Sequence, residues 1–274
     1  MTFIQTILRG IGEVMFQNNI YSGLLFLIGI FYNSWLLGLA ALFGTIISTV
    51  SAHVLKYPKE AIKNGLYGFN GTLTGIAVFC FFEVSVVTVF ALFLGAILST
   101  VIMAYLQKII LPFTAPFVMA TWLTIYFLIV IFNFPLLAPL EQIESSLNFL
   151  ISSGNSFGEV MFQENSITGL FFFIGILLNN KLMAVYAAYA AVLGPIVGWL
   201  VSESSSTINA GLMGYNAILC AIALVGTGWK DFLWITSAII LSTLLNIVMA
   251  MTGLITLTAP FVLATWGILM VNKV

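Results

Sequence analysis

Long apolar stretches follow one another along the chain, and short polar stretches separate them. No charged side chain occurs within residues 109–140 or within residues 232–272. A helix that spans a bilayer needs about 20 apolar residues, whereas a transmembrane strand would show alternation over about 10 residues. The pattern therefore predicts five long helices in each half of the chain. Their expected ranges are 20–37, 38–55, 65–82, 84–106, 113–132, 166–180, 182–201, 211–228, 232–251 and 257–272.

A shorter apolar segment precedes each set of five helices, and it carries the clearest sign of an internal duplication. The hexapeptide Gly-Glu-Val-Met-Phe-Gln at residues 12–17 returns unchanged at residues 158–163. Further along, Thr-Ala-Pro-Phe-Val at residues 114–118 returns at residues 258–262. In an apolar chain, a repeat of this kind is typical of transporters and channels whose site lies where the two halves meet.

Composition places the chain in a membrane. Hydrophobic residues make up 61% of it and charged residues 6%, against roughly 25% charged residues in a soluble domain. We therefore predict an all-α integral membrane protein. The net charge of −1 argues against a nucleic-acid partner. The single histidine, His53, cannot form a histidine-rich metal site, and no nucleotide-binding loop, zinc motif or catalytic triad is visible. We expect neither an enzyme nor a cofactor or bound metal.

The basic residues predict how the chain crosses the membrane. If each short segment dips in and returns, all eight Lys and Arg residues fall on one side; if it crosses, they divide four and four. Lys and Arg collect on the cytoplasmic side, so the first arrangement is favoured. We expect a multi-pass protein of the cell (inner) membrane with both termini in the cytoplasm. Each half then has five transmembrane helices plus one re-entrant half-helix, and the odd number inverts the second half. The expected parts are a first half at 1–132, an extracytoplasmic linker at 133–148 and a second half at 149–274.

The most informative side chains are Glu13 and Glu159, which occupy equivalent places in the two short segments. A carboxylate within a membrane costs at least about 2.5 kcal/mol and normally faces a cavity or a partner. The alternative is an interfacial glutamate close to the headgroups. Phe16 and Phe162 follow three residues later, and on a continuous helix positions i and i+3 share a face. We expect each half to present a carboxylate and an aromatic ring to the same space.

Two further pairs of motifs suggest a path through the protein. Glycines are frequent in residues 65–75, where they permit close helix packing, and Asn70 and Asn216 can satisfy backbone groups that an irregular segment leaves free. Phe69 and Leu73 lie four residues apart, as do Tyr215 and Leu219.

Thr114 and Thr258 each precede Ala-Pro-Phe. Proline disfavours helix for the residue before it and lacks an N–H, so a helix is expected to start or break there. The threonine hydroxyl then either faces a cavity or caps the helix that follows.

With these motifs assembled, the chain resembles the urea transporter family over nearly its whole length. The resemblance rests on residues 9–16, 65–75 and 111–117 and on their second-half partners. It implies ten spanning helices with two re-entrant half-helices, an inverted repeat and a homotrimer in the lipid bilayer. It also implies a flat pore for urea with a selectivity filter between aromatic and aliphatic side chains. The substrate-binding positions that it implies are Glu13, Val14, Phe16, Phe69, Leu73, Thr114, Glu159, Val160, Phe162, Tyr215, Leu219 and Thr258.

The sequence leaves other solutes and other mechanisms open. Many family members carry Gln where this chain has Glu13, which puts strict neutrality of the pore in doubt. The alternatives are transport of other small amides, ammonia or water through the same fold, proton-coupled transport through Glu13 and Glu159, and a receptor or scaffold without flux. The favoured prediction is passive, selective urea transport through a channel-like pore at the interface of the two repeats.

Overall fold

A computed structural model describes residues 2–138 and 146–272, and within these residues the chain forms helices and no strands. The chain divides into two compact units, residues 1–140 (unit 1) and 141–274 (unit 2). In unit 1 the helices are α1 (Phe3–Glu13), α2 (Ile20–Asn33), α3 (Trp35–Val54), α4 (Lys59–Lys63), α5 (Gly68–Phe81), α6 (Val86–Leu106) and α7 (Ala115–Tyr126), which a π-helical turn extends (η1, Phe127–Ile131). In unit 2 they are α8 (Phe149–Glu159), α9 (Ser166–Asn179), α10 (Lys181–Leu200), α11 (Ser205–Asn209), α12 (Tyr215–Ala223), α13 (Trp229–Met251) and α14 (Ala259–Val271).

Each predicted apolar segment contains a helix, although several helix ends differ from the prediction. The break between α2 and α3 falls at Ser34, because the Ser34 side chain accepts a hydrogen bond from the Leu37 N–H at 3.3 Å and begins α3 there. Helix α12 ends at Ala223, five residues before the predicted end, and Gly226 and Gly228 follow it. The short helices α4 and α11 were not predicted. The predicted linker at 133–148 lies partly outside the described residues.

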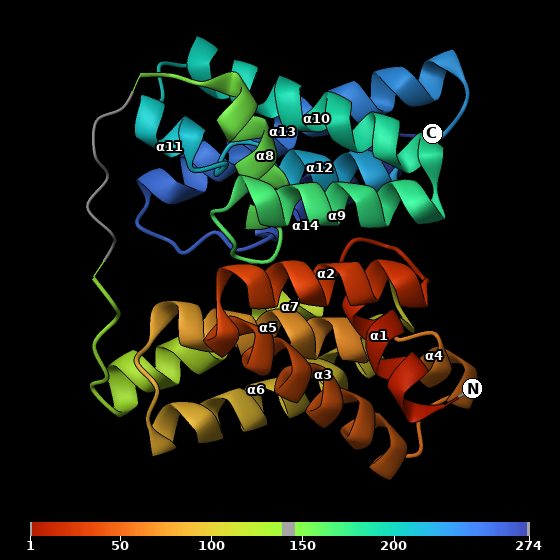
Figure 1. Cartoon of the computed structure of the whole chain (residues 1–274), viewed down its shortest axis with the longest axis vertical. Helices are drawn as coiled ribbons and strands as arrows, with labels where there is room; N and C mark the ends of the chain where they lie inside the picture. The colour runs from red at the N-terminus through yellow and green to blue at the C-terminus, as the bar shows by residue number, and fades with distance from the viewer. Residues whose placement is uncertain (1, 139–145, 273–274) are drawn as a thin grey trace. The chain divides into compact units, whose positions relative to one another are not determined.

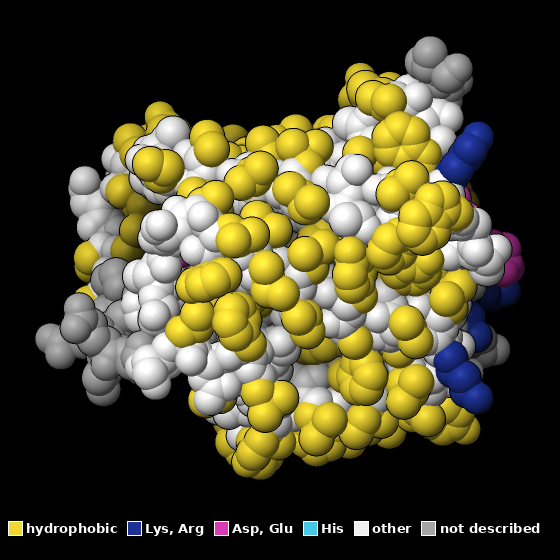
Figure 2. Space-filling view, turned by 90° about the horizontal axis from the view of Figure 1, so that it is seen from above, with side chains coloured by type: hydrophobic (Ala, Val, Ile, Leu, Met, Phe, Trp, Pro, Cys, Tyr) yellow, Lys and Arg dark blue, Asp and Glu magenta, His cyan; other side chains and the backbone are white. Residues whose placement is uncertain are grey.

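The outer surface is apolar, as a membrane protein requires. Within the described residues, four helices of 20 to 23 residues are long and apolar enough to cross a bilayer, namely α3, α6, α10 and α13. Helices α2, α5, α7, α9 and α14 are apolar but shorter. Large hydrophobic side chains stand exposed on these helices, such as Trp35, Val86 and Leu178. Figure 2 shows one face of the protein on which hydrophobic side chains are widespread and charged ones are few.

Each unit is built around one short, buried helix. In unit 1, α5 packs against α1, α3, α6 and α7 (Figure 1), and every residue from Gly68 to Val78 is buried. In unit 2, α12 packs in the same way against α8, α10, α13 and α14. Because these central helices touch protein on all sides, their side chains are the ones that can line an internal site.

Glycines and hydroxyls allow the central helix of unit 1 to sit close to α3. A Cβ on Gly71 would meet the Gly44 carbonyl oxygen and the Ser48 side chain, so the two backbones touch there. Nearby, the Thr45 and Thr72 hydroxyl oxygens are 2.6 Å apart. The glycines of the repeated motif therefore serve close helix packing, as the sequence suggested, and the buried hydroxyls are paired because an unpaired polar group would be costly in this setting.

Candidate functional site

The first candidate element is a tight turn at the end of α1. The helix ends at Glu13, and Phe16 adopts a left-handed backbone with φ of +58°. The Phe16 N–H donates to the Glu13 carbonyl oxygen at 3.0 Å, and the Gln17 N–H donates to the Gly12 carbonyl oxygen at 3.0 Å. The expectation that Glu13 and Phe16 share one face of a continuous helix is therefore wrong. Glu13 is instead the last residue of the helix, and Phe16 closes the turn that follows it.

Unit 2 repeats this turn closely. Helix α8 ends at Glu159, Phe162 has φ of +60°, and its N–H donates to the Glu159 carbonyl oxygen at 3.1 Å. A phenylalanine with positive φ is uncommon, so its presence twice at equivalent positions marks the turn as a specific feature of the protein. Val14 and Val160, inside the turns, are buried, whereas the side chains of Glu13, Phe16, Glu159 and Phe162 are partly exposed.

In unit 1 the turn lies next to the start of α7. The rings of Phe16 and Phe113 meet edge to face, with centroids 6.1 Å apart. Phe113 directly precedes Thr114, which is buried. The structure therefore brings two of the predicted site positions, Phe16 and Thr114, to neighbouring parts of unit 1.

Helix α7 begins with a hydrogen bond supplied by α5. The Thr114 side chain does not cap the helix, which corrects the N-cap alternative. The buried Phe117 N–H instead donates to Asn70 Oδ1 at 3.1 Å. In unit 2, the Phe261 N–H donates to Asn216 Oδ1 at the same distance, and Thr258 likewise does not cap α14. The prediction that these asparagines satisfy backbone groups of an irregular segment is confirmed. Both threonines are buried and directly precede the first residue of a helix that begins inside the protein.

The remaining predicted positions lie on the central helices. Phe69 and Leu73 are buried on α5, and Tyr215 and Leu219 are buried on α12. At Tyr215 the units differ, because its hydroxyl group takes part in a polar cluster that Phe69 cannot form. The Tyr215 oxygen lies 2.7 Å from the Leu257 carbonyl oxygen, 3.0 Å from Thr256 Oγ1 and 3.2 Å from Asn246 Oδ1.

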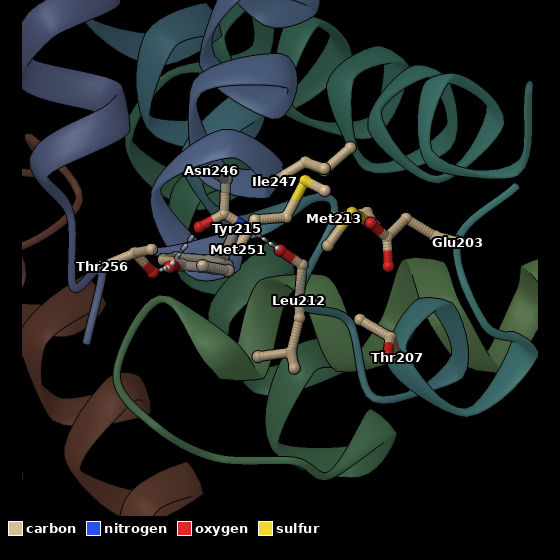
Figure 3. Close-up of a pocket in the computed structure, with 10 residues that line it drawn as sticks. Glu203, Thr207, Leu212, Met213, Tyr215, Asn246, Ile247, Met251 and Thr256 are labelled. Carbon is tan, nitrogen blue, oxygen red and sulfur yellow. Dashed lines mark hydrogen bonds between the residues drawn. The ribbon is translucent and has the colours of Figure 1, made fainter. Parts of the chain in front are cut away.

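Sequence reasoning missed the partners of Tyr215, although one signal pointed to them. Asn246 is a buried amide in the apolar second half of the 23-residue helix α13, and such a residue needs partners. Its Nδ2 donates to the Leu212 carbonyl oxygen at 2.9 Å. Figure 3 shows Asn246, Tyr215 and Thr256 lying together at one end of a pocket, with Glu203 and Thr207 at the other end.

The described residues offer no cluster that would hold a metal ion. His53 lies exposed in the last turn of α3. The site residues are therefore acceptor oxygens, aromatic rings and aliphatic side chains, a set suited to binding a small neutral solute by hydrogen bonds and contact rather than to a covalent reaction.

Comparison with known proteins agrees with this set of residues. The family described as Urea transporter matches residues 4–273. The chain is 32% identical to Urea transporter 1 of Ovis aries over 97% of this chain and 76% of that protein. It is 33% identical to Urea transporter 1 of Mus musculus over 82% of this chain and 64% of that protein. By the extent of these matches and the duplicated motifs, the chain belongs to the urea transporter family.

Proposed function

We propose that this protein carries urea across a membrane passively, through a selective, channel-like pore between two inverted halves. The observation that carries the proposal is the paired turn. In a member of this family, an apolar short helix ends in each unit at a glutamate followed by a left-handed phenylalanine. In this proposal the halves are residues 1–132 and 149–274, and the segment between them is an extracytoplasmic linker.

The chemistry of urea explains why such residues suit it. Urea is planar and neutral, with four N–H donors and one carbonyl acceptor. The flat rings of Phe16 and Phe162, with Leu73 and Leu219, fit its two faces. Glu13, Glu159 and the hydroxyls of Thr114 and Thr258 offer oxygens to its N–H groups, and Val14, Val160, Phe69 and Tyr215 complete the lining. Passage is fast when binding compensates for lost water yet remains weak enough for release.

The contact of Arg9 supports the re-entrant arrangement of the short helix. Arg9 Nη1 donates to Asn64 Oδ1 at 3.3 Å, and Asn64 follows directly after Lys63 of α4. Arg9 thus lies beside the segment that carries Lys63, which agrees with the arrangement in which these basic residues share one side of the membrane. We propose on this basis five spanning helices and one re-entrant helix per half, both termini in the cytoplasm, and the homotrimer that is usual for the family.

The experiment is urea efflux from proteoliposomes that contain the purified protein, with and without a proton gradient. We expect fast efflux that exceeds that of empty liposomes, that does not respond to the gradient, and that close urea analogues reduce by competition. Efflux that requires the gradient would replace the channel by proton-coupled transport through Glu13 and Glu159. The absence of urea efflux beside fast flux of another small amide, ammonia or water would assign the pore to that solute.

A further inference from the structure

Unit 2 contains a cavity that shares only Tyr215 with the proposed pore lining. Its volume is about 350 Å³, within the range of roughly 300–1,000 Å³ of small-ligand sites. Five of the ten lining residues (Figure 3) have polar side chains and five have apolar ones, and the apolar ones make up most of the wall. The lining residues are Glu203, Thr207, Leu212, Met213, Tyr215, Asn246, Ile247, Ala250, Met251 and Thr256.

Alignment of the two units shows what makes this space. Positions 203 and 213 correspond by the repeat shift to Tyr57 and Tyr67. Position 250 corresponds to Gln107 when α13 is aligned with α6. The pairs Ser99-Thr100 and Ser242-Thr243 fix that alignment. In each pair, both hydroxyls donate to one carbonyl oxygen, which lies three residues before the serine. Glu203, Met213 and Ala250 all line the cavity.

In unit 1 the corresponding side chains pack together. The rings of Tyr57 and Tyr67 stack with centroids 5.2 Å apart and planes inclined by 22°. Gln107 Nε2 donates to the Tyr67 hydroxyl oxygen at 2.8 Å. The smaller Met213 and Ala250 cannot occupy the same volume, so unit 2 is open where unit 1 is filled.

The polar end of the cavity has more acceptor oxygens around the Tyr215 hydroxyl than that hydroxyl has protons to donate. The single proton of the Tyr215 hydroxyl is shared between two acceptors, the Leu257 carbonyl oxygen at 2.7 Å and Asn246 Oδ1 at 3.2 Å. Asn246 cannot turn its amide to help, because its Nδ2 donates to the Leu212 carbonyl oxygen. The Leu257 carbonyl oxygen also accepts from Asn216 Nδ2 at 3.5 Å and is not part of the lining, so Asn246 Oδ1 is the acceptor that a donor in the cavity can reach when the Tyr215 proton points to Leu257.

The opposite end is also rich in acceptors. The Glu203 carboxylate lies there beside Thr207 (Figure 3), and no ion pair to Glu203 occurs among the described residues. A solute with several N–H donors and few acceptors matches this wall, and the apolar side chains of Leu212, Met213 and Ile247 suit a flat, uncharged face. Urea has this combination of properties.

We infer that this cavity is a second urea-binding site, separate from the Glu159–Phe162 turn. This inference rests on the urea transport proposed above. It adds a binding site in unit 2, whereas in unit 1 the corresponding space is occupied by side chains of the protein itself. Urea held there lies against Tyr215, which we propose to line the pore. The site raises the local amount of urea at that position when the bulk concentration is low.

The first test fills the cavity with the side chains that unit 1 uses. We expect Met213→Tyr combined with Ala250→Gln to lower urea efflux at least threefold at low urea concentration and much less at saturating urea. The control is Leu233→Tyr, which places the same bulky ring on an exposed position of α13 outside the cavity and leaves efflux unchanged. Equal efflux from the filled and wild-type proteins at every urea concentration would overturn the inference.

The second test does not depend on the filled variant folding. In a Cys80→Ser background, Ala250→Cys is labelled with a small methanethiosulfonate reagent, and urea should slow the labelling in a saturable manner. Lys59→Cys on α4 reports any direct effect of urea on thiol chemistry. If urea slows both positions equally, or neither, the cavity does not bind urea. Wild-type efflux separates the two proposals, because its absence refutes urea transport, whereas normal efflux without protection at position 250 refutes only the second site.

Discussion

Asn70 in unit 1 and Asn216 in unit 2 accept the same backbone hydrogen bond at the same 3.1 Å, yet the residues just before them have diverged. Phe69 carries no polar atom, whereas the Tyr215 hydroxyl contacts three oxygens. The duplicated halves thus retain the bonds that shape the backbone and vary the side chains beside them. A shared fold therefore does not give the two units equal surroundings for a solute.

The contacts of α1 and α8 are also retained in position but differ in side chain. Arg9 of α1 reaches the side chain of Asn64, whereas Asn155, at the equivalent position of α8, donates to the Asn209 backbone oxygen at 2.9 Å. Both bonds fasten the short helix to the region of α4 or α11. A charged group does this in unit 1 and a neutral amide in unit 2, so Glu13 has a cation one helical turn away and Glu159 does not.

Removal of either pore glutamate should reduce transport most, and the two variants together show whether Glu13 and Glu159 are equivalent. Glu13→Ala and Glu159→Ala each remove an acceptor for urea N–H groups, and leaving a desolvated donor without its partner costs about 1–3 kcal/mol, which corresponds to roughly tenfold or more in rate. We expect each variant to reduce urea efflux from proteoliposomes at least about tenfold. Glu159→Gln keeps an acceptor oxygen and is the matched control. Normal conduction by both alanine variants would remove these residues from the site.

The next effect concerns helix packing, where the units differ in residue type. Gly71 of α5 lies against the α3 backbone at Gly44, and the equivalent of Gly71 in unit 2 is Ala217. We expect Gly71→Ala to destabilise the protein by about 3 kcal/mol, at the upper end for overpacking, because the new methyl group meets the Gly44 backbone. Ala217→Gly should cost only about 1 kcal/mol. Thermal unfolding in detergent measures both, and equal shifts would mean that the central helices are packed alike.

A smaller effect is expected from the paired asparagines. Asn70→Ala and Asn216→Ala each leave a buried backbone N–H unpaired, that of Phe117 or Phe261, at a cost of about 2 kcal/mol. The same thermal unfolding assay should give shifts that agree within about 0.5 kcal/mol. A much smaller effect of one substitution would show that α7 and α14 begin by different means.

The smallest changes in stability are expected at α4 and α11, which differ in how they are held. Ser204 caps α11 by accepting from the Thr207 N–H at 3.1 Å, so Ser204→Ala should cost about 1 kcal/mol. Helix α4 instead has the exposed pair Lys63–Glu60 at 2.8 Å, which lowers the pKa of the Glu60 carboxyl group. Its contribution is present at neutral pH and is lost as the pH falls through that lowered pKa. We expect no measurable stability change for Lys63→Ala at pH 7, because solvent screens the pair; a clear loss would contradict this.

The sequence was sufficient for those parts of the fold that depend on apolar periodicity and on repetition. It predicted a helix in each long apolar segment, and it predicted that Asn70 and Asn216 would satisfy backbone groups that lack a partner within a helix. It failed where a single backbone angle decides the geometry. Nothing in the residue type of Phe16 favours positive φ, so the helix was extended through it. The start of α13 was also predicted three residues late, because the bond from the Gly228 N–H to Asp231 Oδ2 begins the helix at Trp229.

The candidate site was predictable only as a set of positions. The family resemblance indicated which residues to consider, but the cluster around Tyr215 joins residues that are 31 to 42 positions apart in the chain. The filled and open forms of the cavity depend on three substitutions far apart in sequence, each of them unremarkable alone. Their combined effect follows only from the packing of α10, α12 and α13.

The hydrogen bond that each asparagine accepts also bears on how the chain folds during synthesis. It links Asn70 to Phe117 within unit 1 and Asn216 to Phe261 within unit 2, so each half contains both partners of its own closing contact. Domains commonly fold one after another as the ribosome produces them. The first half can therefore complete its internal structure before the second has been synthesised, and a ribosome-bound chain that ends shortly after α7 should already resist proteolysis.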